Sequence, residues 1–195
     1  MGRTLRTQRP RAARRSAAAR GFTLIEATLA VTIVAFGFLA TMELFAACTV
    51  QNQRSAQLTI AQMLCTNVQE LTTGLPFKDP YYATATFGPE AGESQLTFND
   101  VDDFDGFTVT PPYDSTRSQI AELKQYTQVV TVTPIDPNRP GHNTDEANLE
   151  IPKRNSAGQA NYTGAVRVRV TILYKRAPTD PGTEVMKTSW VRVDD

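Results

Sequence analysis

The feature that most constrains this chain is an apolar run from Phe22 to Val50, which directly follows a basic start. The run contains two charged residues, Glu26 and Glu43. As a helix, residues 22–47 would be roughly 39 Å long, enough to cross a hydrocarbon core of about 30 Å with some tilt. The run therefore predicts a single membrane-spanning helix near the N-terminus.

The charges of the chain are segregated around this run. Residues 1–20 hold seven arginines and no acidic residue, although the whole chain of 195 residues has a net charge of zero. Without those seven arginines, 13 basic residues face 20 acidic ones, a net charge of −7. By the positive-inside rule, the basic start is expected in the cytoplasm and the C-terminal part outside the membrane. The acidic C-terminal part disfavours nucleic-acid binding.

Three other kinds of N-terminal segment share this pattern. A cleaved signal peptide has an apolar core of about 7 to 15 residues and a small-residue cleavage site, which Ala46 and Ala47 could supply. A lipoprotein signal would end at an acylated Cys48, but Phe45 occupies the place where leucine is usual. A plain signal anchor explains the hydrophobicity and gives no reason for Glu26, since a carboxylate inside a bilayer is costly and usually functional.

Glu26 has an explanation if the chain is cut after Gly21. Phe22 would then carry a new α-amine, and Glu26, four residues further on, lies on the same face of a helix. The amine and the helix dipole both place positive charge at that end. Glu26 would thus be compensated within its own subunit or by the terminus of a neighbouring one.

Residues 20–26 have the sequence RGFTLIE and lead directly into the apolar run. This segment resembles the processing site of type IV prepilins and type II secretion pseudopilins. The resemblance implies that an aspartyl prepilin peptidase in the membrane cuts between Gly21 and Phe22 and methylates the α-amine of Phe22. It also implies that Glu26 aids recruitment into a growing filament by pairing with the terminal amine of an adjacent subunit. The leader of residues 1–21 is longer than is common in the family.

The resemblance predicts a structural role and no enzymatic activity. The expected function is that of a minor or accessory subunit in a type IV pilus or a type II secretion pseudopilus. The expected location is the bacterial inner membrane, with the C-terminal domain in the periplasm, and later a periplasmic or surface filament. The expected partners are the prepilin peptidase, other pilin or pseudopilin subunits and the inner-membrane assembly platform. The alternative is a membrane-anchored periplasmic binding module or enzyme that uses the prepilin signal only for delivery.

Beyond the membrane, the helix is expected to continue to Thr73, with Gly74 and Pro76 as its stop signal. Apolar residues recur there at the spacing of an amphipathic helix, at Leu58, Ala61, Leu64 or Cys65, Val68 and Leu71. On such a helix Cys48 and Cys65 would be roughly 25 Å apart, which is too far for a disulfide. We expect a helix over residues 22–73 and a globular domain over residues 74–195.

The globular domain is expected to contain a small antiparallel β-sheet. The β-branched patterns predict strands over residues 126–133, 165–175 and 184–193, and a short helical turn within 118–125. The middle strand has one face predicted to be buried (Val166, Val168, Val170 and Ile172) and one predicted to meet water (Arg167, Arg169 and Thr171). Residues 135–164 are expected to form a long irregular loop. An α+β fold with the helix packed on the sheet follows, and the family resemblance implies the same fold.

Few residues in the domain suggest chemistry. Four carboxylates lie within six residues, at Asp100, Asp102, Asp103 and Asp105. A solvated acidic turn is the simpler interpretation, and a calcium site is the alternative, because calcium prefers oxygen ligands and major pseudopilins bind it in a loop. The spacing departs from an EF-hand loop, because Phe104 stands at the third ligand position. The one histidine, His142, has no partners for a catalytic triad near it in the sequence, and we expect no resident cofactor.

Overall fold

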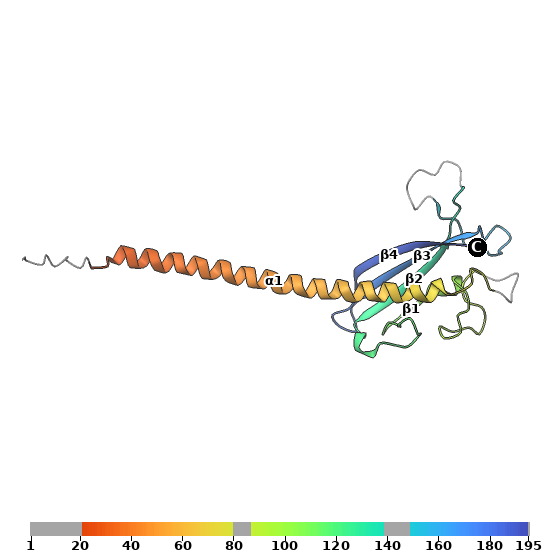
Figure 1. Cartoon of the computed structure of the whole chain (residues 1–195), viewed down its shortest axis with the longest axis horizontal. Helices are drawn as coiled ribbons and strands as arrows, with labels where there is room; N and C mark the ends of the chain where they lie inside the picture. The colour runs from red at the N-terminus through yellow and green to blue at the C-terminus, as the bar shows by residue number, and fades with distance from the viewer. Residues whose placement is uncertain (1–20, 80–86, 139–148, 195) are drawn as a thin grey trace, which may run out of the picture. The chain divides into compact units, whose positions relative to one another are not determined.

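The computed structural model of the chain has an α+β fold, in which one long helix is followed by a four-stranded sheet (Figure 1). The structure describes residues 21–79, 87–138 and 149–194. The arginine-rich leader, apart from Gly21, and His142 therefore lie outside the described residues.

Helix α1 runs from Leu24 to Thr73, 50 residues, which confirms the predicted long helix. It ends where expected, because Gly74 and Pro76 follow its last residue. By length and composition, α1 is the one helix in the described ranges that is able to cross a membrane. The chain divides into two compact units between Val50 and Gln51, so the last 23 residues of α1 belong to the same unit as the sheet.

The sheet is antiparallel throughout, with the strands in chain order from one edge to the other (Figure 1). The strands are β1 (Thr108–Val109), β2 (Tyr126–Pro134), β3 (Ala165–Tyr174) and β4 (Thr183–Val193). The last three are the predicted strands. Strand β1 was not predicted, since two residues are too few for a periodic pattern. Two short 3₁₀ helices, η1 (Asp102–Phe104) and η2 (Ala121–Leu123), lie in the connections, the second within the predicted helical turn.

The core lies between the C-terminal part of α1 and one face of the sheet. The helix contributes Ala61, Leu64, Cys65 and Val68, and strands β2 and β3 contribute Val130, Val132, Val166, Val168, Val170 and Ile172. Prediction of the helix face was wrong at one end, because the Leu58 side chain is half exposed. Thr72 is fully buried instead, and its hydroxyl donates to the Val68 carbonyl oxygen at 3.0 Å.

Gln128 on β2 fixes the helix against the sheet. Its side chain is completely buried, and its Nε2 donates to the carbonyl oxygen of Leu64 in α1 at 3.2 Å. The same amide exchanges hydrogen bonds with the backbone of Tyr113, which closes the connection after β1 onto the sheet. A buried amide with these partners specifies one position of the helix on the sheet, because any sliding would leave its polar atoms without partners.

The opposite face of β3 is not solvated as predicted. Arg167 is buried and Arg169 is half-buried, because Glu150 binds both of their guanidinium groups. Glu150 lies in the connection that was predicted to be irregular. Its backbone forms an isolated antiparallel β-bridge with Ile135, the residue after β2. The prediction failed because a charged residue on a strand can be buried when a carboxylate from a distant segment pairs with it.

Candidate functional site

The N-terminal end of α1 carries the residues of the suspected processing and assembly site. Gly21, Phe22 and Thr23 are not helical, and the helix begins at the next residue. The Glu26 carboxylate accepts hydrogen bonds from the backbone N–H of Thr23 at 2.9 Å and from its hydroxyl at 3.0 Å. In return, the Thr23 hydroxyl oxygen accepts from the Glu26 backbone N–H at 3.2 Å.

These reciprocal bonds form a capping box, in which Thr23 is the cap residue and Glu26 the third residue of the first turn. The sequence carries the signal for this cap, a threonine followed three residues later by a glutamate. Glu26 therefore has a local structural role in addition to any role for its charge. Since glutamine also completes a capping box, these two roles are separable by substitution.

The residues on both sides of the suspected cleavage point are exposed. Phe22 exposes 78% of its surface, and a Cβ added to Gly21 would meet no other atom within 4 Å. Packing within the described part of the chain therefore does not require a glycine at position 21.

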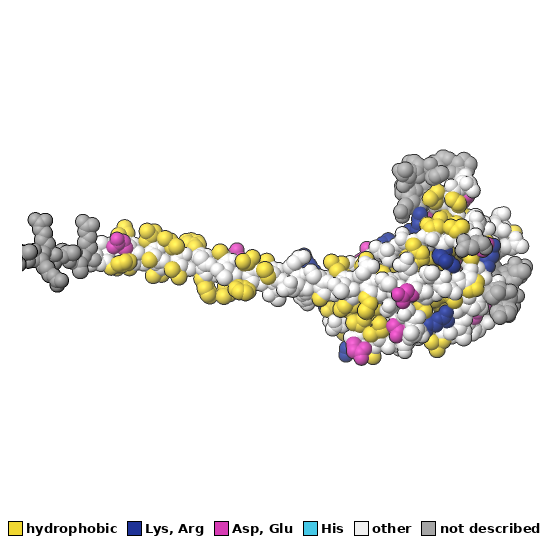
Figure 2. All heavy atoms as spheres, viewed as in Figure 1, with side chains coloured by type: hydrophobic (Ala, Val, Ile, Leu, Met, Phe, Trp, Pro, Cys, Tyr) yellow, Lys and Arg dark blue, Asp and Glu magenta, His cyan; other side chains and the backbone are white. Residues whose placement is uncertain are grey.

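An apolar surface covers the N-terminal half of α1 (Figure 2). From Gly21 to Val50 every side chain is exposed except that of Ala27, which is half-buried. The large apolar side chains of this surface are Leu24, Ile25, Leu29, Val31, Ile33, Val34, Phe36, Phe38, Leu39, Met42, Leu44 and Phe45. A continuous surface of this kind marks a membrane or protein contact, since soluble monomers rarely expose large apolar patches.

Both cysteines are free thiols, in line with their predicted separation. Cys65 lies in the core, and burial raises the pKa of its thiol to about 11. Cys48 is exposed near the end of the apolar surface. Cys65 therefore lacks the lowered thiol pKa that marks a reactive cysteine.

The four aspartates between residues 100 and 105 do not form a solvated turn. Asp100, Asp102 and Asp103 are each at most 2% exposed, and only Asp105 is half-buried. Burial and the negative charges of Asp102 and Asp103 raise the pKa of Asp100 to about 9. The expectation of a solvated turn was wrong, because these residues form η1 and the turns around it, and three of the four are buried.

Most of these carboxylates are held by donors within the chain. Asp100 accepts from the backbone N–H groups of Asp102 and Asp103, at 3.1 and 3.2 Å. Asp102 accepts from the backbone N–H of Gly88 at 2.8 Å and from the Tyr162 hydroxyl.

Asp105 accepts from the backbone N–H of Val132 at 3.0 Å and forms an ion pair with Lys153. The described acidic residues whose ligand atoms lie within 4.8 Å of one another are a different set, namely Asp79, Glu90 and Glu93.

Comparisons of the chain with protein-family models, with curated proteins and with solved structures find no match. The architecture itself, a long apolar N-terminal helix packed at its C-terminal end on a small antiparallel sheet, is compatible with a pilin-like protein. One candidate membrane-spanning helix near the N-terminus is consistent with a single-pass membrane protein.

Proposed function

We propose that the chain is a minor or accessory subunit of a type IV pilus-like or type II secretion pseudopilus filament. The observation that carries the proposal is the exposed apolar surface of the N-terminal half of α1, together with the prepilin-type segment at residues 20–26. In this proposal lipid covers the apolar half before assembly, and the corresponding halves of neighbouring subunits cover it in the filament. Since lipid tails are as apolar as these side chains, the transfer depends on helix packing and on charge.

Processing between Gly21 and Phe22 is the first step of the proposal. The exposed, non-helical backbone from Gly21 to Thr23 is accessible to a peptidase at the membrane surface. Glycine at position 21 has no packing role in the described chain, so recognition by the prepilin peptidase is the proposed reason for it. The new α-amine of Phe22 is then methylated by the same enzyme.

Recruitment through the Glu26 charge is the second step. Glu26 and Glu43 are the two acidic residues of the apolar half, and Glu26 stands in its first helical turn. The capping box leaves the carboxylate exposed, so it can meet the α-amine of a neighbouring subunit. An ion pair between two subunits, away from water, fixes the axial position of one helix against the next.

Three single substitutions test the role of the charge in the cells that make the protein. Glu26→Gln keeps the capping box and removes the charge, whereas Thr23→Val removes the hydroxyl of the cap and keeps the charge. Glu43→Gln removes the other acid of the same helix half and is the matched control. All three variants are expected to remain processed and membrane-inserted, as judged by the mass of the mature N-terminus.

The amount of subunit in filaments sheared from the cells is the second measurement. It is expected to fall by about tenfold or more for Glu26→Gln and to stay near the wild-type level for the other two variants, because removal of one partner of a desolvated charge pair weakens association strongly. Normal incorporation of Glu26→Gln would contradict the filament proposal. It would favour the alternative of a membrane-anchored periplasmic module, whose activity does not need this charge.

A further inference from the structure

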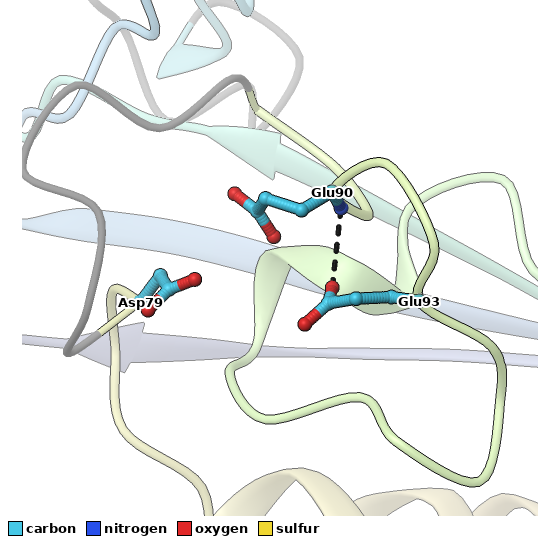
Figure 3. Close-up of side chains that lie close together, drawn as sticks. All are labelled: Asp79, Glu90 and Glu93. Carbon is cyan, nitrogen blue, oxygen red and sulfur yellow. Dashed lines mark hydrogen bonds between the residues drawn. The ribbon is translucent and has the colours of Figure 1, made fainter.

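Three carboxylates from two separate segments converge in the C-terminal unit. Asp79 lies six residues after the helix, and Glu90 and Glu93 lie on both sides of one turn (Figure 3). One ligand atom from each residue lies within 4.8 Å of the other two. Asp79 is buried, and both glutamates are half-buried.

The turn holds Glu93 in a fixed orientation. Its Oε2 accepts from the backbone N–H of Glu90 at 3.1 Å, and its Oε1 accepts from Nδ2 of Asn99 at 3.0 Å (Figure 3). Because both hydrogen bonds come from within the described chain, the Glu93 carboxylate has one position and directs its remaining lone pairs at the other acids.

A fourth carboxylate is buried against this group. Asp103 is 1% exposed, and its Oδ2 accepts from the backbone N–H groups of Asn99 and Asp100, at 2.8 and 3.1 Å. Its Oδ1 is also buried, and no described residue donates a hydrogen bond to it. Asn99 links Asp103 to Glu93, since its backbone N–H donates to the Asp103 carboxylate and its side-chain amide donates to the Glu93 carboxylate.

Acceptor oxygens without donors are concentrated around Glu93. Besides Oδ1 of Asp103, Oε2 of Glu90 and Oδ1 of Asn99 are buried without a hydrogen-bond donor among the described residues. A buried polar atom without a partner costs about 1–3 kcal/mol, and a charged one costs more. None of the four ion pairs between described residues includes Glu90, Glu93 or Asp103.

Burial and mutual repulsion make this group unfavourable when it is ionised and alone. One ligand atom from each of Asp79, Glu90 and Glu93 lies within 4.8 Å of the other two, and Asp103 is 1% exposed. Positive charge brought into the group from outside the described residues would relieve the repulsion and satisfy several oxygens at once.

We propose that Asp79, Glu90 and Glu93 bind a hard divalent cation, with Asp103 as an additional buried negative charge behind Glu93. The ligands are all carboxylates, without cysteine or histidine, and such a ligand set favours a hard cation over zinc. Calcium fits better than magnesium, since it accepts six to eight oxygens in irregular geometry, including bidentate carboxylates and water. Of the four sequence-based calcium candidates, only Asp103 belongs to this site.

The cation joins the segment after α1 to the turn that carries Glu90 and Glu93. Phe87 and Phe98 lie at the two ends of this turn region and belong to the domain core. The cation is therefore expected to stabilise the connection between the helix and the sheet. This inference is independent of the proposed filament function, because it concerns the fold of the C-terminal unit alone.

Glu90→Gln is the sharpest test, since it removes the charge of one proposed ligand and keeps the size of the side chain. The full-length protein in detergent is stripped with EDTA, and calcium chloride is titrated in a calorimeter. We expect one calcium per chain and a rise of about 5 °C or more in Tm at a calcium concentration of about 100 times Kd. Glu90→Gln is expected to weaken calcium binding tenfold or more while remaining at least as stable as the wild type in EDTA.

Glu122→Gln, which removes an exposed acid from η2, is the matched control and is expected to bind like the wild type. Glu93→Gln is the second variant and is expected to lose binding as well. The proposal is overturned if the wild type shows no binding heat and no Tm shift, or if both cluster variants bind calcium like the wild type. A larger stabilisation by magnesium chloride than by calcium chloride would overturn the preference for calcium.

Discussion

The two halves of α1 belong to one continuous helix, but they differ in the exposure of their apolar side chains. Before Gln51 almost every side chain is exposed, and the apolar ones surround the helix on all sides. After Gln51 the buried side chains form one stripe, and polar residues cover the rest. The second pattern is that of a helix whose partner is in the same chain, whereas the first requires a partner outside it. Secondary structure alone thus gives no indication of what a helix contacts.

A chain that begins at Gln51 provides the largest expected contrast. Because residues 51–195 form a compact unit with their own core, this fragment is expected to be soluble without detergent and to unfold in one cooperative transition. Circular dichroism during heating measures the transition. A fragment that aggregates or lacks a transition would show that the first half of α1 is needed for the fold.

Truncation of one leucine in each half compares them residue by residue. Leu64→Ala is expected to lower the free energy of unfolding by about 2–5 kcal/mol, because the Leu64 side chain is completely buried. Leu39→Ala is expected to change it by less than about 0.5 kcal/mol, since the Leu39 side chain is exposed. Urea denaturation of the full-length protein in detergent measures both. Equal effects would remove the distinction between the halves.

The reactivity of the two cysteines, one in each half of α1, compares the halves without a change in the stability of the protein. Cys48 in the exposed half is expected to react with a membrane-permeant maleimide on the order of 100-fold faster than Cys65, because Cys65 is buried and burial raises the pKa of its thiol to about 11. Mass spectrometry of timed samples, with the single variants Cys48→Ser and Cys65→Ser, measures the two rates. Similar rates would indicate that the packed half of α1 opens readily.

The smallest effect concerns the ion pairs on the far face of the sheet. Burial alone would raise the pKa of Glu150, but Arg169 and Arg167 hold it below its usual value of 4.5. The stabilisation that depends on its charge is present above that usual pKa and is lost as the pH falls through the lower pKa of the folded state. Glu150→Gln is expected to cost less than about 1 kcal/mol at pH 7 and nothing once the wild-type carboxyl is protonated. Urea unfolding at pH 7 and pH 3 measures this, with Glu122→Gln as control.

The sequence was sufficient for the elements with a strong periodic or stop signal. Helix α1 follows from an apolar run, an amphipathic stretch and a glycine–proline stop, and β3 follows from four aliphatic residues at alternate positions. The membrane candidate follows from length and composition alone. In each case the signal is local, so one segment contains all the necessary information.

The sequence was insufficient wherever a side chain depends on a distant partner. Arg167 looks solvated by alternation and is buried because Glu150 returns to it from another segment. Gln128 looks like an ordinary strand residue and holds α1 in place. The acidic cluster required Asp79 to meet Glu90 and Glu93, and no spacing rule brings these positions together. The capping box at Thr23 is the exception, because its signal, threonine followed three residues later by glutamate, is local.

The cap at Thr23 has a consequence for maturation. The two residues of the cap, Thr23 and Glu26, lie C-terminal to the bond between Gly21 and Phe22. Cleavage of that bond would therefore leave every hydrogen bond of the cap intact. The precursor and the product would therefore begin their helix at the same residue. A peptidase acting there would meet a short non-helical segment that needs no unwinding, and two residues, Phe22 and Thr23, would precede the helix in the product.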